Sequence, residues 1–199
     1  MNKPDNPNND LIAGVDEVGR GPLIGSVVAA ACILPEVFDL PGLNDSKKIS
    51  ATKREQLAVL IKQQAIAWSV AQASAQEIDQ INVLQASLLA MKRAVQALSV
   101  QPGFVLVDGN KLPDWSYASR AVVGGDGIEP AISAASVLAK VARDADMVKL
   151  SEQHPHYGFD KHKGYPTKQH MEALQQHGIL PEHRTSFGPV RKIIDAKKA

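Results

Sequence analysis

The sequence has one cysteine, few aromatic residues and no long hydrophobic run. Cys32 alone cannot form an internal disulfide in a chain of 199 residues, so we expect a reducing, cytoplasmic location. Aromatic residues make up 5% of the chain, so Val, Ile, Leu and Ala must fill the core. No apolar stretch reaches the roughly 18 residues that span a bilayer, and residues 1–10 are too polar for a secretory signal. We therefore expect a soluble protein that does not act at a membrane.

The net charge of +1 is unevenly distributed along the chain. Residues 1–139 contain 11 Lys and Arg against 14 Asp and Glu, a balance of −3, whereas residues 140–199 contain 11 against 7, a balance of +4. An excess of positive charge favours contact with a polyanion, although an ordinary solvated surface would give the same balance. The length suits one domain, and we expect a disordered leader at 1–10, a core at 11–150 and a helical, basic extension at 151–199.

Hydrophobic periodicity predicts a mixed α/β fold. We expect strands at 11–16, 26–34, 66–74, 103–108 and 118–126, with the first two joined as a hairpin. We expect helices at 52–65, 81–98, 130–152 and 167–177, the first opened by a capping box of Thr52 and Glu55 and the third by Pro130. Three early strands followed by alternating strands and helices indicate a mixed sheet with helices on its faces.

Carboxylates follow three of the predicted strands. Asp16 and Glu17 end the first strand, Asp108 ends the fourth and Asp126 ends the fifth. If these ends are level, the carboxylates meet at the edge of the sheet where α/β proteins bind ligands. Asp108 and Asp126 also fit ordinary turns. Four clustered carboxylates repel one another unless cations neutralise them, and two Mg²⁺ or Mn²⁺ ions would balance their charge.

Asp16 and Glu17 are adjacent, and adjacent side chains on a regular strand point to opposite faces of a sheet. Both can face one site if the strand breaks near Gly19 and Gly21, which is the arrangement we favour. Alternatively, one of the two ligates a cation from the side, together with its backbone carbonyl.

The acids are followed directly by Gly19, Arg20 and Gly21. Glycines allow backbone N–H groups to approach a sugar-phosphate closely, and a guanidinium offers a planar fork to phosphate. Lys47 and Lys48, in the loop "NDSKK", are predicted phosphate contacts, with ordinary solvated lysines as the alternative.

The segment 154–170 interleaves cations with aromatic residues, which is typical of nucleic-acid binding. Its histidines lack the spacing of a zinc site. Further on, the segment "EHRTSFGPV" adds Arg184 and Ser186 as expected substrate contacts.

Six motifs resemble bacterial ribonuclease HII, in the family's order and from about residue 11 to residue 190. They are "GVDEVGRGPLIG", "LNDSKK", "VDGN", "ISAASVLAKVARD", "GFDKHKGYPT" and "HRTSFGPV". The resemblance implies a ribonuclease H-like fold with a helical C-terminal extension. It implies Mg²⁺- or Mn²⁺-dependent cleavage of RNA in RNA–DNA hybrids and at single ribonucleotides in duplex DNA, serving ribonucleotide removal. Two-metal catalysis would leave 3′-hydroxyl and 5′-phosphate ends.

The resemblance also implies roles for particular residues. The turn at 19–21 senses the ribose 2′-hydroxyl, and Tyr165 stacks on the sugar next to the RNA–DNA junction. The acidic metal-binding set corresponds to Asp16, Glu17, Asp108 and Asp126. One position departs from the family's pattern, because glycines precede Asp126 where a lysine is common. We expect a monomer whose partners are hybrid and ribonucleotide-containing duplexes.

Two other classes of protein share part of this pattern. A non-catalytic nucleic-acid-binding module would use the basic extension, but acids at three strand ends would repel its ligand. Another metal-dependent nuclease of the same fold, such as a DNA nuclease or resolvase, would share the acids and differ in substrate. A nucleotide-binding P-loop is excluded, because the sequence has no G-x-x-x-x-G-K-[ST] motif.

Overall fold

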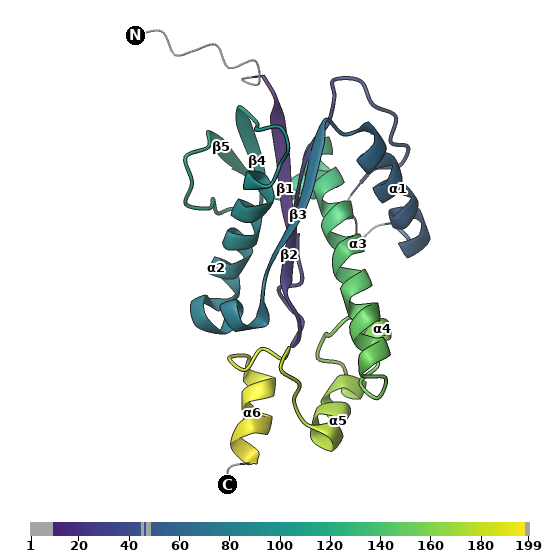
Figure 1. Cartoon of the computed structure of the whole chain (residues 1–199), viewed down its shortest axis with the longest axis vertical. Coiled ribbons are helices and arrows are strands. Elements are labelled where there is room, and N and C mark those ends of the chain that lie inside the picture. Colours follow the sequence, from purple (N-terminus) through teal and green to yellow (C-terminus); the bar gives the residue numbers. More distant parts are fainter. Residues whose placement is uncertain (1–9, 45, 47–48, 198–199) are drawn as a thin grey trace.

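A mixed five-stranded sheet forms the centre of the fold in the computed structural model, which describes residues 10–44, 46 and 49–197 (Figure 1). The strand order is β3-β2-β1-β4-β5. The hairpin prediction is confirmed, because β1 and β2 pair antiparallel, as do β2 and β3, whereas β1, β4 and β5 run parallel. The strands are β1 Ile12–Val18, β2 Val27–Ile33, β3 Ala67–Ala73, β4 Phe104–Asp108 and β5 Ser119–Val122.

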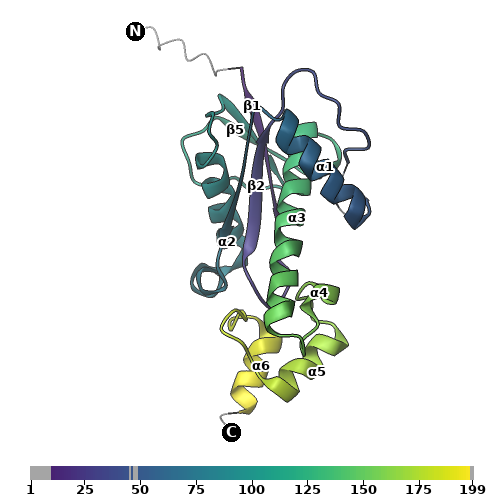
Figure 2. The same cartoon turned by 45° about the vertical axis from the view of Figure 1, so that its right-hand side comes forward.

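Helices cover both faces of this sheet. Helix α2 (Ala75–Gln96) lies on one face, and α1 (Ala51–Gln64) and α3 (Pro130–Gln153) lie on the other (Figure 2). Alternate residues of β2 divide between the two cores: Ala29 and Ala31 pack on the α2 side, and Ala30 and Cys32 pack on the α1–α3 side. The expected mixed sheet flanked by helices is therefore confirmed.

The start of α3 approaches β1 very closely at Gly14. A Cβ atom on Gly14 would lie 2.2 Å from the carbonyl carbon of Ala131 and from the nitrogen of Ile132. Only glycine fits there, and this contact brings the first turns of α3 against the strand that carries Asp16 and Glu17.

Two helix starts differ from the sequence-based expectation. Helix α1 is capped by Ser50, whose hydroxyl accepts from the Lys53 N–H, rather than by Thr52. Helix α2 begins at Ala75, six residues earlier than expected, behind a capping box of Ser74 and Glu77. Asn82, with a φ of 67°, interrupts this helix, so its first turns do not share one apolar stripe with the rest.

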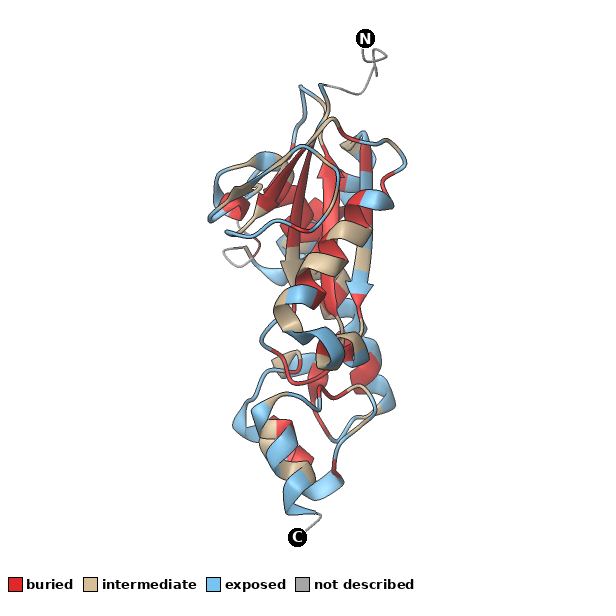
Figure 3. Ribbon diagram, turned by 90° about the vertical axis from the view of Figure 1, so that its left-hand side faces the viewer, coloured by how far each residue is buried: buried red, intermediate tan, exposed pale blue. Residues whose placement is uncertain are grey.

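Three short helices form the C-terminal extension below the sheet (Figure 1). They are α4 Phe159–His162, α5 Lys168–His177 and α6 Gly188–Ala196, of which α4 and α6 had not been expected. The extension has its own cluster of buried side chains, to which Leu23 and Ile24 of the β1–β2 turn also belong. Figure 3 shows these buried residues among the C-terminal helices, in addition to those in the sheet. Among the described residues, no helix has the length and apolarity to cross a membrane.

Candidate active site

Asp16 and Asp108 end neighbouring parallel strands at the same level. Val15 of β1 pairs with Val107 of β4, so the carboxylates that follow them lie side by side at one edge of the sheet. The expected convergence of these two acids is present. Asp126 is placed differently, because β5 ends at Val122 and Asp126 lies in the 3-10 turn η1, Gly125–Gly127.

Asp16 is a buried carboxylate in an unfavourable electrostatic environment. Burial raises the pKa of Asp16 well above its usual value, and repulsion from Glu17 and Asp108 raises it further. Its Oδ1 accepts from the Glu17 N–H at 2.7 Å, and Ser136 of α3 also hydrogen-bonds to it, which opposes the shift. The net effect is a carboxylate whose charged form would be stabilised by a nearby cation.

Glu17 points to the other face of the sheet. The expected break in β1 is wrong, because the ladder with β2 continues regularly through the pair Val18–Val28. Glu17 and Asp108 both line a pocket of about 240 Å³ beneath α2. Burial raises the pKa of Glu17, and Arg20, at 3.3 Å, opposes that shift.

Asp126 is connected to the other acids through its backbone. Its N–H donates to Oδ1 of Asp108 at 3.3 Å, and its carbonyl accepts from the Ser133 hydroxyl of α3 at 2.7 Å. Its side chain is buried. The turn at 125–127 is thus held between β4 and α3, beside the carboxylate of Asp108.

The donor set suits a hard divalent cation. Within the described part of the chain, no group of three or more His, Cys, Asp or Glu side chains is close enough together to hold a metal ion. However, Asp16, Glu17 and Asp108 each interact electrostatically with the other two. A cation among them would relieve this repulsion, and carboxylate oxygens are the ligands that Mg²⁺ and Mn²⁺ prefer. The residues present therefore fit the ions that the sequence implies.

Arg184 is completely buried beneath the turn that follows the acids. Its guanidinium donates to four carbonyls, those of Gly19 at 2.6 Å, Arg20 at 2.9 Å, Pro22 at 2.7 Å and Gly25 at 2.9 Å. This geometry corrects the expectation of a direct substrate contact. Arg184 holds the turn at residues 19–25 in place.

A second buried arginine, Arg143 of α3, lies under the same turn. Its Nη2 donates to the Ile24 carbonyl at 2.7 Å, and a Cβ atom on Gly19 would lie 3.0 Å from its Nε. Burial lowers the pKa of Arg143, and burial followed by repulsion from Arg143 lowers the pKa of Arg184 to about 9. The Nε and Nη1 groups of Arg143 have no hydrogen-bond partner in the described part of the molecule.

Tyr165 lies beside the turn. Its side chain is 47% exposed, and a Cβ atom on Gly21 would lie 3.0 Å from its ring carbon Cε1. Its carbonyl lies 3.1 Å from Nδ1 of the buried His170, which fixes the backbone at this point. Glycine at position 21 thus leaves room for the ring.

The remaining expected contacts are placed as follows. The hydroxyl of Ser186 donates to Oδ1 of Asp79 on α2 at 2.6 Å, and its contact with substrate stays a prediction. Lys47 and Lys48 lie outside the described residues. Ser46, in the same loop, lies 2.8 Å from Ser136 between the two hydroxyl oxygens, which ties this loop to the helix that contacts Asp16.

Sequence reasoning missed three residues that shape the site, namely Ser136, Arg143 and Asp79. The first two lie in the motif "ISAASVLAKVARD", whose polar side chains have no role in the sequence-based prediction. Their spacing of seven puts them on one face of α3, two turns apart, which was an available signal. Asp79 had no signal, because its partners lie more than 100 positions away.

The strand order, with carboxylates at the ends of the two central parallel strands, defines the ribonuclease H-like class of proteins. Solved structures share this fold. The ribonuclease H2 from Pyrococcus horikoshii matches with a TM-score of 0.79 and 26% identity, over 94% of this chain and 99% of that one. Bst-RNase HIII, solved in complex with Mn²⁺, matches with a TM-score of 0.67 and 16% identity, over 94% and 70%.

Sequence comparison identifies the particular family. The family model described as ribonuclease HII matches residues 13–190. The ribonuclease HII of Neisseria meningitidis strain FAM18 is 61% identical over 184 residues, which cover 92% of this chain and 95% of that protein. The chain belongs to the ribonuclease HII family. It is therefore a ribonuclease of the H type, acting on RNA–DNA hybrids.

Proposed function

We propose that this ribonuclease also incises duplex DNA at single embedded ribonucleotides, using two divalent cations held by Asp16, Glu17, Asp108 and Asp126. The observation that carries the proposal is the position of Asp16 and Asp108 at the neighbouring ends of the parallel strands β1 and β4. Burial and the neighbouring carboxylates also raise the pKa of Asp16. When bound, Mg²⁺ or Mn²⁺ would supply the Lewis acidity that activates water and stabilises charge on the leaving 3′-oxygen. The products would carry 3′-hydroxyl and 5′-phosphate ends.

Discrimination between RNA and DNA is assigned to the turn at 19–21. A peptide group is planar and trans, so its N–H points away from its carbonyl. Arg184 draws the carbonyls of Gly19 and Arg20 inward, and the N–H groups of Arg20 and Gly21 therefore point away from Arg184. We infer that these N–H groups bind the ribose 2′-hydroxyl and the adjoining phosphate. A deoxyribose lacks the 2′-hydroxyl and would leave an N–H group unpaired, so the turn would discriminate strongly against DNA at the cleavage site.

Tyr165 is proposed to stack on the sugar beside the RNA–DNA junction. Its half-exposed ring next to Gly21 places an aromatic face within one residue of the proposed 2′-hydroxyl sensor. Arg20, whose side chain is exposed, is a proposed phosphate contact, as are Lys47 and Lys48, which precede α1 in the sequence.

We also infer that residues 11–150 form the catalytic core and that residues 151–199 extend the same domain. The shared cluster of buried side chains, in which Leu23 and Ile24 of the core pack with Phe159 and Val190 of the extension, supports this division. We further propose that the protein is a monomer, that it is located in the cytoplasm and that it serves to remove ribonucleotides from DNA.

Cleavage of three duplexes in titrated Mg²⁺ and Mn²⁺ tests this function. One duplex is all DNA, the second carries a single central ribonucleotide and the third is a long RNA–DNA hybrid. We expect cleavage of the second and third, with 3′-hydroxyl ends, and none of the first. Cleavage of the all-DNA duplex would identify a DNA nuclease or resolvase, and full activity after exhaustive chelation would contradict the role of the carboxylates.

A further inference from the structure

A groove of about 610 Å³ runs along α2 next to the catalytic pocket. Its walls are α2 and the segment 111–114, which follows the Asp108 turn. Leu84, Leu88 and Lys111 line both the groove and the pocket that contains Glu17 and Asp108. The two hollows are therefore adjacent, and the groove lies next to the expected point of cleavage.

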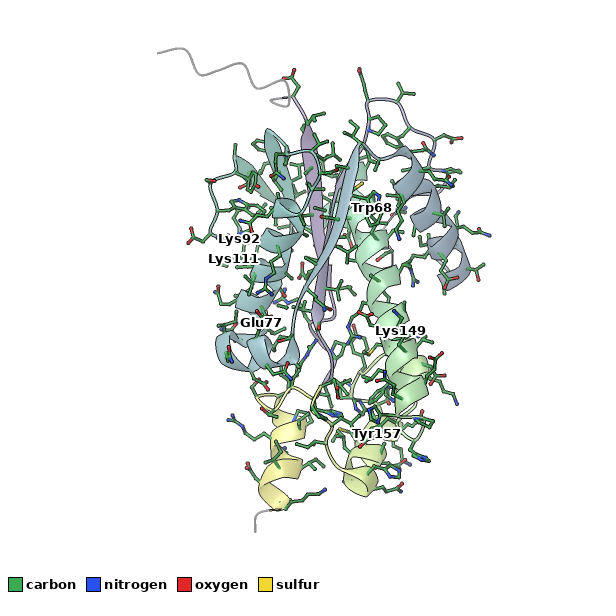
Figure 4. All side chains as sticks on the ribbon, in the orientation of Figure 1. Trp68, Glu77, Lys92, Lys111, Lys149 and Tyr157 are labelled. Carbon is green, nitrogen blue, oxygen red and sulfur yellow. The ribbon has the colours of Figure 1, made fainter. Side chains whose placement is uncertain are left out.

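The groove combines an apolar floor with a cationic rim. Leu84, Leu88 and Leu89 of α2 form the floor together with Leu112 opposite. Two lysines, Lys92 and Lys111, also line the groove together with one exposed acid, Asp114, and Figure 4 shows the lysines close together beside α2.

The two lysines are placed differently at this rim. The ammonium of Lys92 donates to the Asp114 carbonyl at 2.7 Å, which fixes its position. An ammonium has three donors, so this bond leaves it able to contact an anion as well. Lys111 is exposed and lies where the groove meets the carboxylates.

We propose that this groove binds the nucleic-acid strand on one side of the scissile phosphate. The backbone phosphates contact Lys92 and Lys111, and the sugars and bases lie against the leucine floor. This inference rests on the proposed function, because it takes the strand in the groove to be the one whose scissile phosphate is bound in the adjoining catalytic pocket.

The adjoining catalytic pocket favours nucleic acid over other anions. An acidic peptide would also gain from the lysines, but only a nucleic-acid strand has a scissile phosphate bound in the pocket of Glu17 and Asp108, next to the groove. A strand held at its scissile phosphate must extend beyond the pocket on both sides. The groove along α2 offers it two lysines and an apolar surface on one of these sides. The groove is lined by segments different from those that hold the 19–21 turn and Tyr165.

The test compares the double variant Lys92→Ala/Lys111→Ala with Lys149→Ala. Lys149 is an exposed lysine of α3 and lies across the sheet from the groove (Figure 4), so its variant is the matched control. The substrate is duplex DNA with one ribonucleotide and about ten base pairs on each side. We expect the double variant to raise KM roughly ten-fold, by more than it lowers kcat, and to reduce the slope of log KM against log salt by about one for each lysine. Lys149→Ala should match the wild type.

Shortening the duplex separates a strand-binding groove from a general charge effect. Trimming one flank should raise the wild-type KM by a similar factor and leave the double variant almost unaffected, whereas trimming the other flank should affect both proteins equally. Unchanged KM and salt slope in a folded double variant would overturn the groove proposal, as would equal penalties from both flanks in both proteins. A wild-type enzyme that does not cleave this substrate would instead refute the proposed function.

Discussion

Nη2 of Arg184 lies 2.6 Å from the carbonyl oxygen of Gly19, although 165 positions separate the two residues in the chain. The contact joins the C-terminal extension to the turn directly after Asp16 and Glu17. Three more carbonyls of the same turn accept from this guanidinium. Recognition of the ribose is therefore expected to depend on a residue that does not touch it.

Replacing Arg184 with lysine should damage the turn more than the fold. An ammonium cannot reach all four carbonyls, and each buried carbonyl left unpaired costs about 1–3 kcal/mol. We expect single-turnover cleavage at an embedded ribonucleotide to fall at least about ten-fold, with binding of all-DNA duplex unchanged. Urea unfolding should show a folded but less stable protein. Arg191→Lys, at an exposed position of α6, is the control, and wild-type cleavage by Arg184→Lys would contradict the positioning role.

Asp16→Asn should abolish cleavage and stabilise the protein in the absence of metal. The substitution keeps the size of the side chain and removes a buried charge that two other carboxylates repel. We expect a midpoint of thermal unfolding about 2–4 °C higher, which corresponds to roughly 1 kcal/mol for a chain of this size. Added Mg²⁺ should raise the midpoint of the wild type more than that of the variant. Hybrid binding should persist, and near-normal turnover would refute the assignment of Asp16.

Tyr165→Ala should reduce cleavage at a single embedded ribonucleotide more than cleavage of a long hybrid, because only the former depends on one junction. Tyr165→Phe keeps the ring beside Gly21 and should retain most of the activity on both substrates. The side chain is half-exposed, so stability should change little. Specificity constants on the two substrates provide the measurement, and equal losses for Tyr165→Ala would count against junction reading.

The buried pair His170–His183 should make the extension sensitive to acid. Their Nε2 atoms lie 3.2 Å apart, and Nδ1 of His183 accepts from the Leu180 N–H. Burial, and then repulsion from His170, lowers the pKa of His183 from about 6.5 to about 4. Between these pH values the unfolded chain binds a proton that the folded chain does not, so the free energy of unfolding decreases as pH falls.

The size of this effect follows from the shift in pKa. A pKa shift of this size should lower the free energy of unfolding by about 3 kcal/mol between pH 7 and pH 4. Urea unfolding across this range should show a shallower dependence on pH for His183→Asn than for the wild type. His156→Asn, at an exposed position, should follow the wild type. Parallel curves for all three proteins would show that His183 does not carry the effect.

The sequence predicts the sheet well because its strands are short, largely apolar runs, and acids or glycines lie at or near the ends of β1, β4 and β5. The ends of β1 and β4, with Asp16 and Asp108, could be located without coordinates, since parallel neighbours present their carboxyl ends at one edge. Asp126 was harder to place, because "VVGGDG" does not show where the strand stops and the turn begins. The glycines allow either arrangement, and packing of η1 against α3 decides between them.

The roles of charged residues in the extension could not be predicted from the sequence. Arg184 and Ser186 have the chemistry of phosphate ligands, and nothing near them in the chain shows that their partners are the turn at 19–25 and Asp79. Burial of an arginine depends on carbonyls supplied by a distant segment. Helix α6 could not be predicted for a related reason. Its charged residues suggest a solvated tail, whereas Val190 and Ile193 on its apolar side pack on the rest of the extension.

The long separation between Gly19 and Arg184 has a consequence for biosynthesis. The ribosome adds Arg184 only 165 residues after Gly19, so the turn is made long before the guanidinium that orders it. A nascent chain, or one clipped before Arg184, would already contain Asp16, Glu17, Asp108 and Asp126 but would lack the side chain that holds the turn. Such a chain should therefore keep the four carboxylates while the carbonyls of residues 19–25 have lost their common donor.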